Sequence, residues 1–257
     1  MIIWYNQNQD ERIQLLKLKK NRGTLIARNI GALFSKGDYI IIPDSDDILS
    51  NKILKICYNL SIRYKYEMIR FNQYEERSNG YWMKVFNGFK IHEIYQPELS
   101  TFIFYGLGNL KLHDFCISNK FIKRVLFIKA LNSINQYYLK QYMVGLEDCL
   151  INFSLHRNAQ SLYLLNKLGY YYIYNNNSIT HKKSVNRTLK FRFLYLKFIY
   201  ENTKNTLFEK DMAFFVFNRK LKNINSLNII NNEFNFYNGT LIAYHQFIIN
   251  PFKCRII

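Results

Sequence analysis

The sequence has little proline, little glycine and few acidic residues. Only 3 of its 257 residues are Pro and 10 are Gly, which excludes collagen-like and linker-rich chains. No apolar run is long enough for a transmembrane helix, and the sequence does not open with a basic segment followed by an apolar stretch. We therefore predict neither a membrane span nor a signal peptide, and expect the protein in the cytoplasm or at the cytoplasmic face of a membrane.

The 4 cysteines lack the spacing of a metal or redox site. No two of them form a Cys-x-x-Cys motif, because they stand far apart at Cys57, Cys116, Cys149 and Cys254. Cys57 and Cys149 lie in apolar helical patterns. Buried free thiols are therefore favoured over the two disulfides that four cysteines would allow.

Apolar and basic residues are abundant. Hydrophobic residues make up 49% and aromatic residues 17% of the chain, which is enough to build a core and excludes intrinsic disorder. Lys and Arg number 36 against 18 Asp and Glu, and the net charge of +18 attracts nucleic acid, anionic lipid and phosphorylated metabolites alike. An AT-rich coding sequence would also enrich Asn, Lys, Ile, Tyr and Phe, so the charge alone identifies no partner.

Strands and helices are predicted to alternate in the N-terminal part. The hydrophobic pattern predicts, in order, a strand at 13–18, a helix from an N-cap at Thr24 to Gly37, a buried parallel strand at 38–43, a helix capped by Ser50 and a strand at 68–71. This order is typical of an open, mostly parallel α/β sheet flanked by helices. In such sheets ligands bind at the carboxyl ends of the strands.

The rest of the chain has a weaker pattern. Residues 75–112 are predicted to form loops and short strands that line a cleft. Beyond them we predict a helix at 118–130 with a basic side at Lys120, Lys123 and Arg124, a helix at 148–158, two strands at 161–165 and 170–174, and helices from 186 to 223.

Three carboxylates follow the predicted strand at 38–43. Asp44, Asp46 and Asp47 stand together, and like charges at that distance repel unless a cation compensates them. Mg²⁺ and Mn²⁺ prefer carboxylate ligands, and an Asp-x-Asp motif lets the metal bridge protein and nucleotide phosphates. The alternative is a solvated acidic turn that begins the next helix, where Asp is also favoured.

A second acidic pair, Glu147 and Asp148, precedes an apolar helical pattern. It is either the charged first turn of that helix or a carboxylate placed to act as a general base. Its distance along the chain from Asp46 neither supports nor excludes proximity in space.

Four short motifs occur in a recognisable order. They are Asn21-Arg22-Gly23, Ala27-Arg28-Asn29-Ile30-Gly31, Gly37-Asp38-Tyr39-Ile40 and Asp44-Ser45-Asp46-Asp47. With Gly145-Leu146-Glu147-Asp148 further on, they resemble the motifs of family 2 glycosyltransferases, which have the GT-A fold. The resemblance covers about residues 12–182 and departs from the family at Ser35, where alanine is usual.

The resemblance implies roles for these residues. Asp46 would be the main ligand of a Mn²⁺ or Mg²⁺ ion, and Asp44 would help to hold this ion or contact the ribose of the nucleotide. Asp148 would be the base that deprotonates the acceptor hydroxyl, with Glu147 beside it, and Arg28 would contact the nucleotide. The implied reaction transfers a sugar, with inversion, from a nucleotide diphosphate donor, most often a UDP-sugar, to a hydroxyl of a carbohydrate, lipid or protein.

Two further residues receive weaker roles from the same resemblance. Asp47 would assist the neighbouring carboxylates without binding the ion itself. His181 would be either a third metal ligand or an ordinary surface or core histidine.

The resemblance also implies a division of the chain. Residues 1–185 would form a GT-A-like domain and residues 186–257 a helical C-terminal extension. The apolar strands with which family members begin have no counterpart here, so we expect an incomplete domain that is poorly soluble and binds its donor weakly. The basic and aromatic C-terminal part would form core helices or contact a membrane surface peripherally.

Two other functions remain open on the sequence. The first is an inactive fragment or relative that acts as the partner of an intact enzyme. The second is a nucleic-acid-binding module, which the charge of +18 and the many Tyr and Phe residues would favour. No RRM, OB, KH or helix-turn-helix pattern is present, so we expect no specific nucleic-acid partner.

Overall fold

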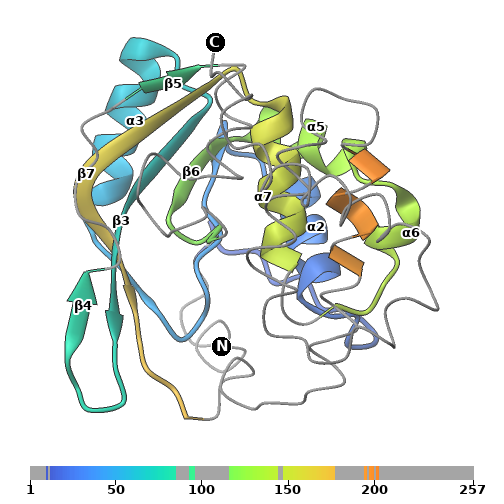
Figure 1. Cartoon of the computed structure of the whole chain (residues 1–257), viewed down its shortest axis with the longest axis horizontal. Coiled ribbons are helices and arrows are strands. Elements are labelled where there is room, and N and C mark those ends of the chain that lie inside the picture. Colours follow the sequence, from blue (N-terminus) through green and yellow to red (C-terminus); the bar gives the residue numbers. More distant parts are fainter. Residues whose placement is uncertain are drawn as a thin grey trace, which may run out of the picture.

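The computed structural model describes residues 10, 12–84, 93–95, 116–143 and 147–176, together with short helical pieces at 194–195, 197–199 and 201–202. Within these residues the protein is a mixed α/β fold with one seven-stranded sheet (Figure 1). The strands are β1 (Tyr39–Ile40), β2 (Ile48–Leu49), β3 (Met68–Glu76), β4 (Trp82–Lys84), β5 (Glu93–Tyr95), β6 (Lys120–Lys123) and β7 (Ser161–Tyr172). The helices are α2 (Thr24–Phe34), α3 (Ile53–Tyr64), α5 (Arg124–Ser133), α6 (Gln136–Leu139) and α7 (Glu147–Asn158).

The sheet is mixed, and the prediction of a mostly parallel sheet was wrong. Its order is β1-β6-β3-β7-β2, with β4 beside β3 and β5 beside β7. Among the described strands, only β3 and β7 pair in parallel, and all other neighbours are antiparallel. The reason is that β6, from later in the chain, lies between β1 and β3 and runs against both of them. Periodicity identifies a strand but not the direction of its neighbour.

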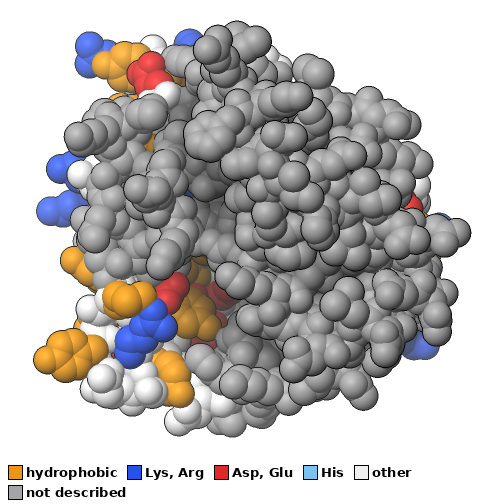
Figure 2. Space-filling model, in the orientation of Figure 1, with side chains coloured by type: hydrophobic (Ala, Val, Ile, Leu, Met, Phe, Trp, Pro, Cys, Tyr) orange, Lys and Arg blue, Asp and Glu red, His pale blue; other side chains and the backbone are white. Residues whose placement is uncertain are grey.

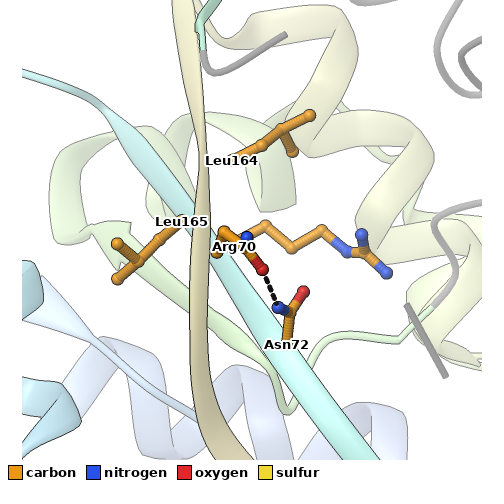
Figure 3. Close-up of a pocket in the computed structure, with 5 residues that line it drawn as sticks. Arg70, Asn72, Leu164 and Leu165 are labelled. Atoms are coloured by element: carbon orange, nitrogen blue, oxygen red, sulfur yellow. Dashed lines mark hydrogen bonds between the residues drawn. The ribbon is translucent and has the colours of Figure 1, made fainter. Parts of the chain in front are cut away.

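Helices cover both faces of the sheet. Leu25 of α2, Leu126 of α5 and Phe153 of α7 are buried in one hydrophobic cluster, which also contains Leu164 of β7. On the other face, α3 packs its own cluster against Leu165 and other residues of the sheet. Figure 3 shows this alternation, since Leu164 and Arg70 point to one side of the paired strands while Leu165 points to the other.

Strand β7 is continuous, whereas the sequence predicted two strands. It pairs with β3 over its whole length, with register shifts around Asn72 that absorb the intervening residues. The Asn72 side-chain amide donates a hydrogen bond to Asn166 Oδ1 at 2.8 Å in this region (Figure 3). Gly169, which falls between the two predicted strands, lies inside β7.

Gly169 is required by close packing, and this gives a first prediction. A Cβ at this position would lie 2.4 Å from Phe71 Cδ2 and 2.5 Å from Ile53 Cγ1, which is closer than packed atoms approach. We expect Gly169→Ala to lower the free energy of unfolding by about 1–3 kcal/mol in urea denaturation. Gly31→Ala is the matched control, because α2 is helical there and a Cβ would meet no atom within 4 Å. The control should be neutral or slightly stabilising; equal losses in both variants would contradict the packing argument.

The helix predicted at 118–130 begins later than expected. Residues Lys120–Lys123 form β6, and only from Arg124 onward is the chain helical. Lys120 is fully buried in strand β6, so the prediction of a helix with a basic side at this residue was wrong. The strand predicted at 13–18 is also absent, because residues 13–18 are irregular and largely exposed.

Other predictions are confirmed. The helices predicted after Thr24, after Ser50 and before Asn158 are α2, α3 and α7. Cys57 and Cys149 are buried free thiols. Most of the region from 186 onward, and with it the proposed domain boundary, lies outside the described residues. Among those that are described, no helix is long and apolar enough to cross a membrane.

Candidate functional site

The candidate site lies at one edge of the sheet. Strands β1 and β3 both run against β6, and β7 runs parallel to β3, so the carboxyl ends of all three reach the same edge. The segment Asp44–Asp47 follows β1 at this edge, and residues 173–175 follow β7 there. This is the position at which open α/β sheets bind ligands.

Asp47 holds the acidic segment against the end of β7. Its carboxylate accepts hydrogen bonds from the Tyr170 hydroxyl at 2.5 Å and from the Ile173 backbone N–H at 2.9 Å. The backbone N–H of Asp44 in turn donates to the Tyr170 hydroxyl at 3.1 Å. Burial raises the pKa of Asp47, in spite of these hydrogen bonds. Asp47 is therefore an anchor of the segment.

Asp46 is exposed at the rim of the site. One of its carboxylate oxygens accepts a hydrogen bond from Asn175 Nδ2 at 3.3 Å. An exposed carboxylate suits a Mg²⁺ or Mn²⁺ ion, which takes one or two protein carboxylates and completes its shell with water and phosphate oxygens. Within the described residues, no group of three or more His, Cys, Asp and Glu side chains is gathered for a metal. The residues present fit a shared site of this kind and not an all-protein metal cage.

Arg28 joins the two acidic motifs. From α2, its guanidinium contacts Asp44 Oδ1 at 3.0 Å and Glu147 Oε1 at 2.8 Å, and it also donates to Asp148 Oδ1. The Arg28 side chain is only 10% exposed, so these contacts are largely shielded from water. Asp44 and Asp148 are remote along the chain, and one buried cation brings them to the same place.

Thr24 supports this arrangement from the first turn of α2. Its hydroxyl lies 2.7 Å from Glu147 Oε1 and 3.2 Å from the Met143 carbonyl oxygen. The prediction of Thr24 as an N-cap was wrong, because Gly23 occupies that position with φ of 85° and a Cβ there would lie 2.7 Å from the Met143 carbonyl oxygen. Glu147 is thus a buried carboxylate held between Thr24 and Arg28.

The environment of Asp148 favours its protonated form more than water does. Burial raises the pKa of Asp148 to about 7, and the negative charges of Glu147 and Asp44 act in the same direction. The positive charges of Arg28 and Lys120 oppose this shift. A carboxyl group that titrates near neutral pH can accept a proton from a hydroxyl more readily than an ordinary aspartate.

Lys120 is the residue that the sequence analysis assigned wrongly. Its ammonium group donates to the carbonyl oxygen of Cys116, and its charge acts on Asp148. In sequence it resembles any surface lysine, because nothing in its neighbours marks β6 as buried. Its burial depends on strand pairing between β6 and β3.

The site therefore gathers four of the five residues predicted from the sequence. Asp44, Glu147 and Asp148 meet at Arg28. Asp46 follows Asp44 by two residues and contacts Asn175 at the solvent-exposed side. The predicted contact of Arg28 with a nucleotide stays a prediction. Other positions that the sequence singled out lie outside the described residues, namely His181, Gly145 and Leu146.

Comparisons with known proteins indicate the family of this chain. Residues 4–131 match the family described as Glycosyl transferase family 2. The chain is similar to poly(ribitol-phosphate) β-N-acetylglucosaminyltransferase TarP of Staphylococcus aureus, with 24% identity over 177 residues, which are 68% of this chain and 50% of TarP. It is also similar to glycosyltransferase GlyG of Streptococcus pneumoniae serotype 4, with 29% identity over 118 residues, which are 46% of this chain and 32% of GlyG.

The fold is similar to that of solved structures. A crystal structure of S. aureus TarS residues 1–349 in complex with UDP-GlcNAc matches with a TM-score of 0.61 and 16% identity, over 86% of this chain and 61% of that one. The chain thus spans about half the length of TarP and about a third of GlyG. Because the family match includes the four N-terminal motifs and the mixed sheet agrees with a GT-A-like fold, we conclude that the chain belongs to glycosyltransferase family 2.

Proposed function

We propose that this protein transfers a sugar from a nucleotide diphosphate donor to a hydroxyl group of an acceptor, with the help of a divalent metal ion and with inversion at the anomeric carbon. The observation that carries the proposal is the contact of Arg28 with both Asp44 and Asp148. It puts the motif suited to a metal and diphosphate beside a carboxylate suited to accept a proton. Transfer needs both groups within reach of one donor sugar.

UDP-GlcNAc is the donor that we propose. TarS was crystallised with this compound, and TarP is named for transfer of N-acetylglucosamine to poly(ribitol-phosphate). By the same similarity we propose a polymer as the acceptor. The net charge of +18 supports a negatively charged polymer, because a positive field attracts it and speeds its encounter with the site.

This reaction assigns a proposed role to each residue of the site. Asp46, assisted by Asp44, would hold Mn²⁺ or Mg²⁺, which when bound neutralises charge on the departing diphosphate. Asp148 accepts the proton of the attacking hydroxyl. Glu147 fixes Arg28, and Arg28 keeps Asp44 and Asp148 in place while it balances their charge.

Metal-dependent nucleotide binding gives the test of this proposal. Ten times the dissociation constant of UDP, added with Mn²⁺, stabilises a folded protein by about 1.4 kcal/mol, so we expect a rise in melting temperature of a few degrees. The rise should need both UDP and Mn²⁺ and should be lost in Asp46→Asn. Asp38→Asn is the matched control, because Asp38 is an exposed carboxylate close in sequence and outside the site.

The outcome separates the proposal from its alternatives. A shift that persists in Asp46→Asn would contradict the assigned metal ligand, and no shift at millimolar UDP would contradict nucleotide binding by this chain. The same titration yields the dissociation constant and so tests the expectation of weak donor binding.

A further inference from the structure

A row of apolar side chains crosses the sheet beside the candidate site. Tyr74 of β3 is paired in register with Tyr171 of β7, and Tyr171 is paired with Ile48 of β2. The Trp82 ring of β4 meets the Tyr171 ring edge to face, with centroids 5.9 Å apart, and the Tyr74 and Tyr171 rings lie 6.3 Å apart. We call these four residues, of which all but Ile48 are aromatic, the aromatic row.

The row faces the side of the sheet that carries α2 and α7. Tyr170 and Tyr172 pack with the cluster under α3 on the opposite face. Because side chains alternate along a strand, Tyr171 points away from α3. Its paired neighbours in the row share that side, because residues directly opposite in a sheet lie on one face.

Much of this apolar surface is open to solvent. Ile48 is 55% and Trp82 is 44% exposed. Figure 2 shows hydrophobic side chains gathered at the lower left, where Figure 1 draws the hairpin of β3 and β4. Contiguous exposed apolar side chains of this kind mark binding surfaces, and Trp and Tyr contribute most to such contacts.

The row is continuous with the candidate site. Ile48 directly follows Asp47, and Tyr171 stands between the two residues that hydrogen-bond to the Asp47 carboxylate, Tyr170 and Ile173. The hairpin extends β3 at its carboxyl end, which is the edge of the sheet that carries Asp46. A chain-like ligand that lies on the row would therefore reach the rim of the site.

We propose that the aromatic row is a subsite that binds sugar rings of the acceptor. The apolar C–H face of a pyranose suits flat aromatic side chains, and its hydroxyl edge remains in water at an open surface such as this one. The proposal rests on the proposed function, because the transferase reaction is what places an acceptor at this edge of the sheet.

Tryptophan fluorescence tests the subsite without any turnover. The chain has 2 Trp residues, Trp4 and Trp82, so Trp4→Phe leaves Trp82 as the reporter. We expect the N-acetylglucosamine tetrasaccharide to change the emission of this variant saturably, and Tyr171→Ala to weaken the binding about three- to tenfold. Tyr58→Ala, an exposed tyrosine on α3, should change nothing.

Three outcomes would overturn the subsite. They are no response to the tetrasaccharide, an equal response to oligo-dT, which would indicate general stacking on bases, and binding of a ribitol-phosphate oligomer with no binding of the tetrasaccharide, which would exclude recognition of sugar rings.

Kinetics separate this inference from the proposed function. In an active protein, Trp82→Ala should raise the acceptor KM about three- to tenfold, while kcat and the donor KM stay unchanged and Trp82→Phe restores most of the loss. An unchanged acceptor KM would overturn the subsite and leave the transferase intact. A saturable fluorescence change in a protein that transfers no sugar would overturn the proposed function and leave a sugar-binding surface.

Discussion

Asp148→Asn is expected to lower kcat by about 10²- to 10⁴-fold, because the amide cannot accept the proton of the acceptor hydroxyl. The substitution keeps the size of the side chain, so α7 should remain in place and UDP with Mn²⁺ should still raise the melting temperature. Steady-state kinetics with UDP-GlcNAc measure the effect, and Asp38→Asn is the control. Retention of more than a tenth of the wild-type kcat would contradict the role of Asp148 as the base.

The same residue predicts the pH dependence of the reaction. Burial raises the pKa of Asp148 to about 7, and only its ionised form can act as a base. In wild-type protein, kcat/KM should therefore fall as the pH drops below neutral, and not only below about 4 as for an ordinary aspartate. Arg28 and Lys120 favour the ionised form, whereas Glu147 and Asp44 oppose it. A rate that is constant from pH 8 to pH 5 would contradict this environment.

The raised pKa of Asp148 also makes the free energy of unfolding depend on pH. The Asp148 carboxyl group keeps its proton to a higher pH in the folded state than in the unfolded state. The stability that Asp148 contributes is therefore present at low pH and is lost as the pH rises through the pKa of Asp148 in the folded protein. Urea denaturation of wild type and Asp148→Asn should show a difference that grows in favour of the variant from pH 5 to pH 8. A stability difference between the two proteins that is independent of pH would contradict the raised pKa of Asp148.

Arg28→Met is expected to give the largest loss of stability. It removes the cation that three carboxylates share, and Glu147 is only 8% exposed, so its charge cannot turn to water. Breaking a buried pair costs about 3–5 kcal/mol, and we expect about 3 kcal/mol because Asp44 and Asp148 are partly exposed. Transfer activity should be lost as well, since both motifs lose their common partner.

Controls distinguish this loss from a general effect of removing an arginine. Arg63→Met on the exposed side of α3 should change the free energy of unfolding by less than about 0.5 kcal/mol. Arg28→Lys should recover only part of the loss, because an ammonium group cannot reach three carboxylates as a guanidinium does. The deficit of Arg28→Met should shrink at pH 5, because burial raises the pKa of Asp148 to about 7 and this carboxyl group has taken up its proton there. Equal deficits at pH 5 and pH 8 would contradict the charge argument.

The elements that carry local signals could be predicted from the sequence. Helix α2 has an apolar face, α7 contains several closely spaced apolar residues, and the segment Asp44–Asp47 follows a short apolar strand. Their positions and their resemblance to family 2 could therefore be predicted. The direction of β6 was not, because antiparallel pairing with both β1 and β3 depends on a segment some eighty residues away along the chain. The same applies to Lys120, whose burial is a result of that pairing.

The candidate site, too, could be predicted from the sequence only in part. Asp44 and Asp148 could be nominated from their neighbours in sequence, but their meeting at Arg28 depends on how α2 packs against α7. The hydrogen bond from Thr24 to Glu147 joins residues 123 positions apart, and the capping preference of threonine predicted a different role. Asp47 was predicted as a helper of the metal, whereas its contacts with Tyr170 and Ile173 require β7 to end beside it.

The most direct test of the account is a crystal structure of the protein grown with Mn²⁺ and UDP. The account predicts anomalous density for Mn²⁺ at about 2 Å from a carboxylate oxygen of Asp46, as expected for a coordinated divalent ion. The diphosphate should lie on this ion, and the Asp148 carboxylate should face the same cavity with Arg28 beside it. A Mn²⁺ ion bound away from Asp46, or UDP bound where the Asp148 carboxylate cannot face it, would contradict the claim that the two acidic motifs form one active site.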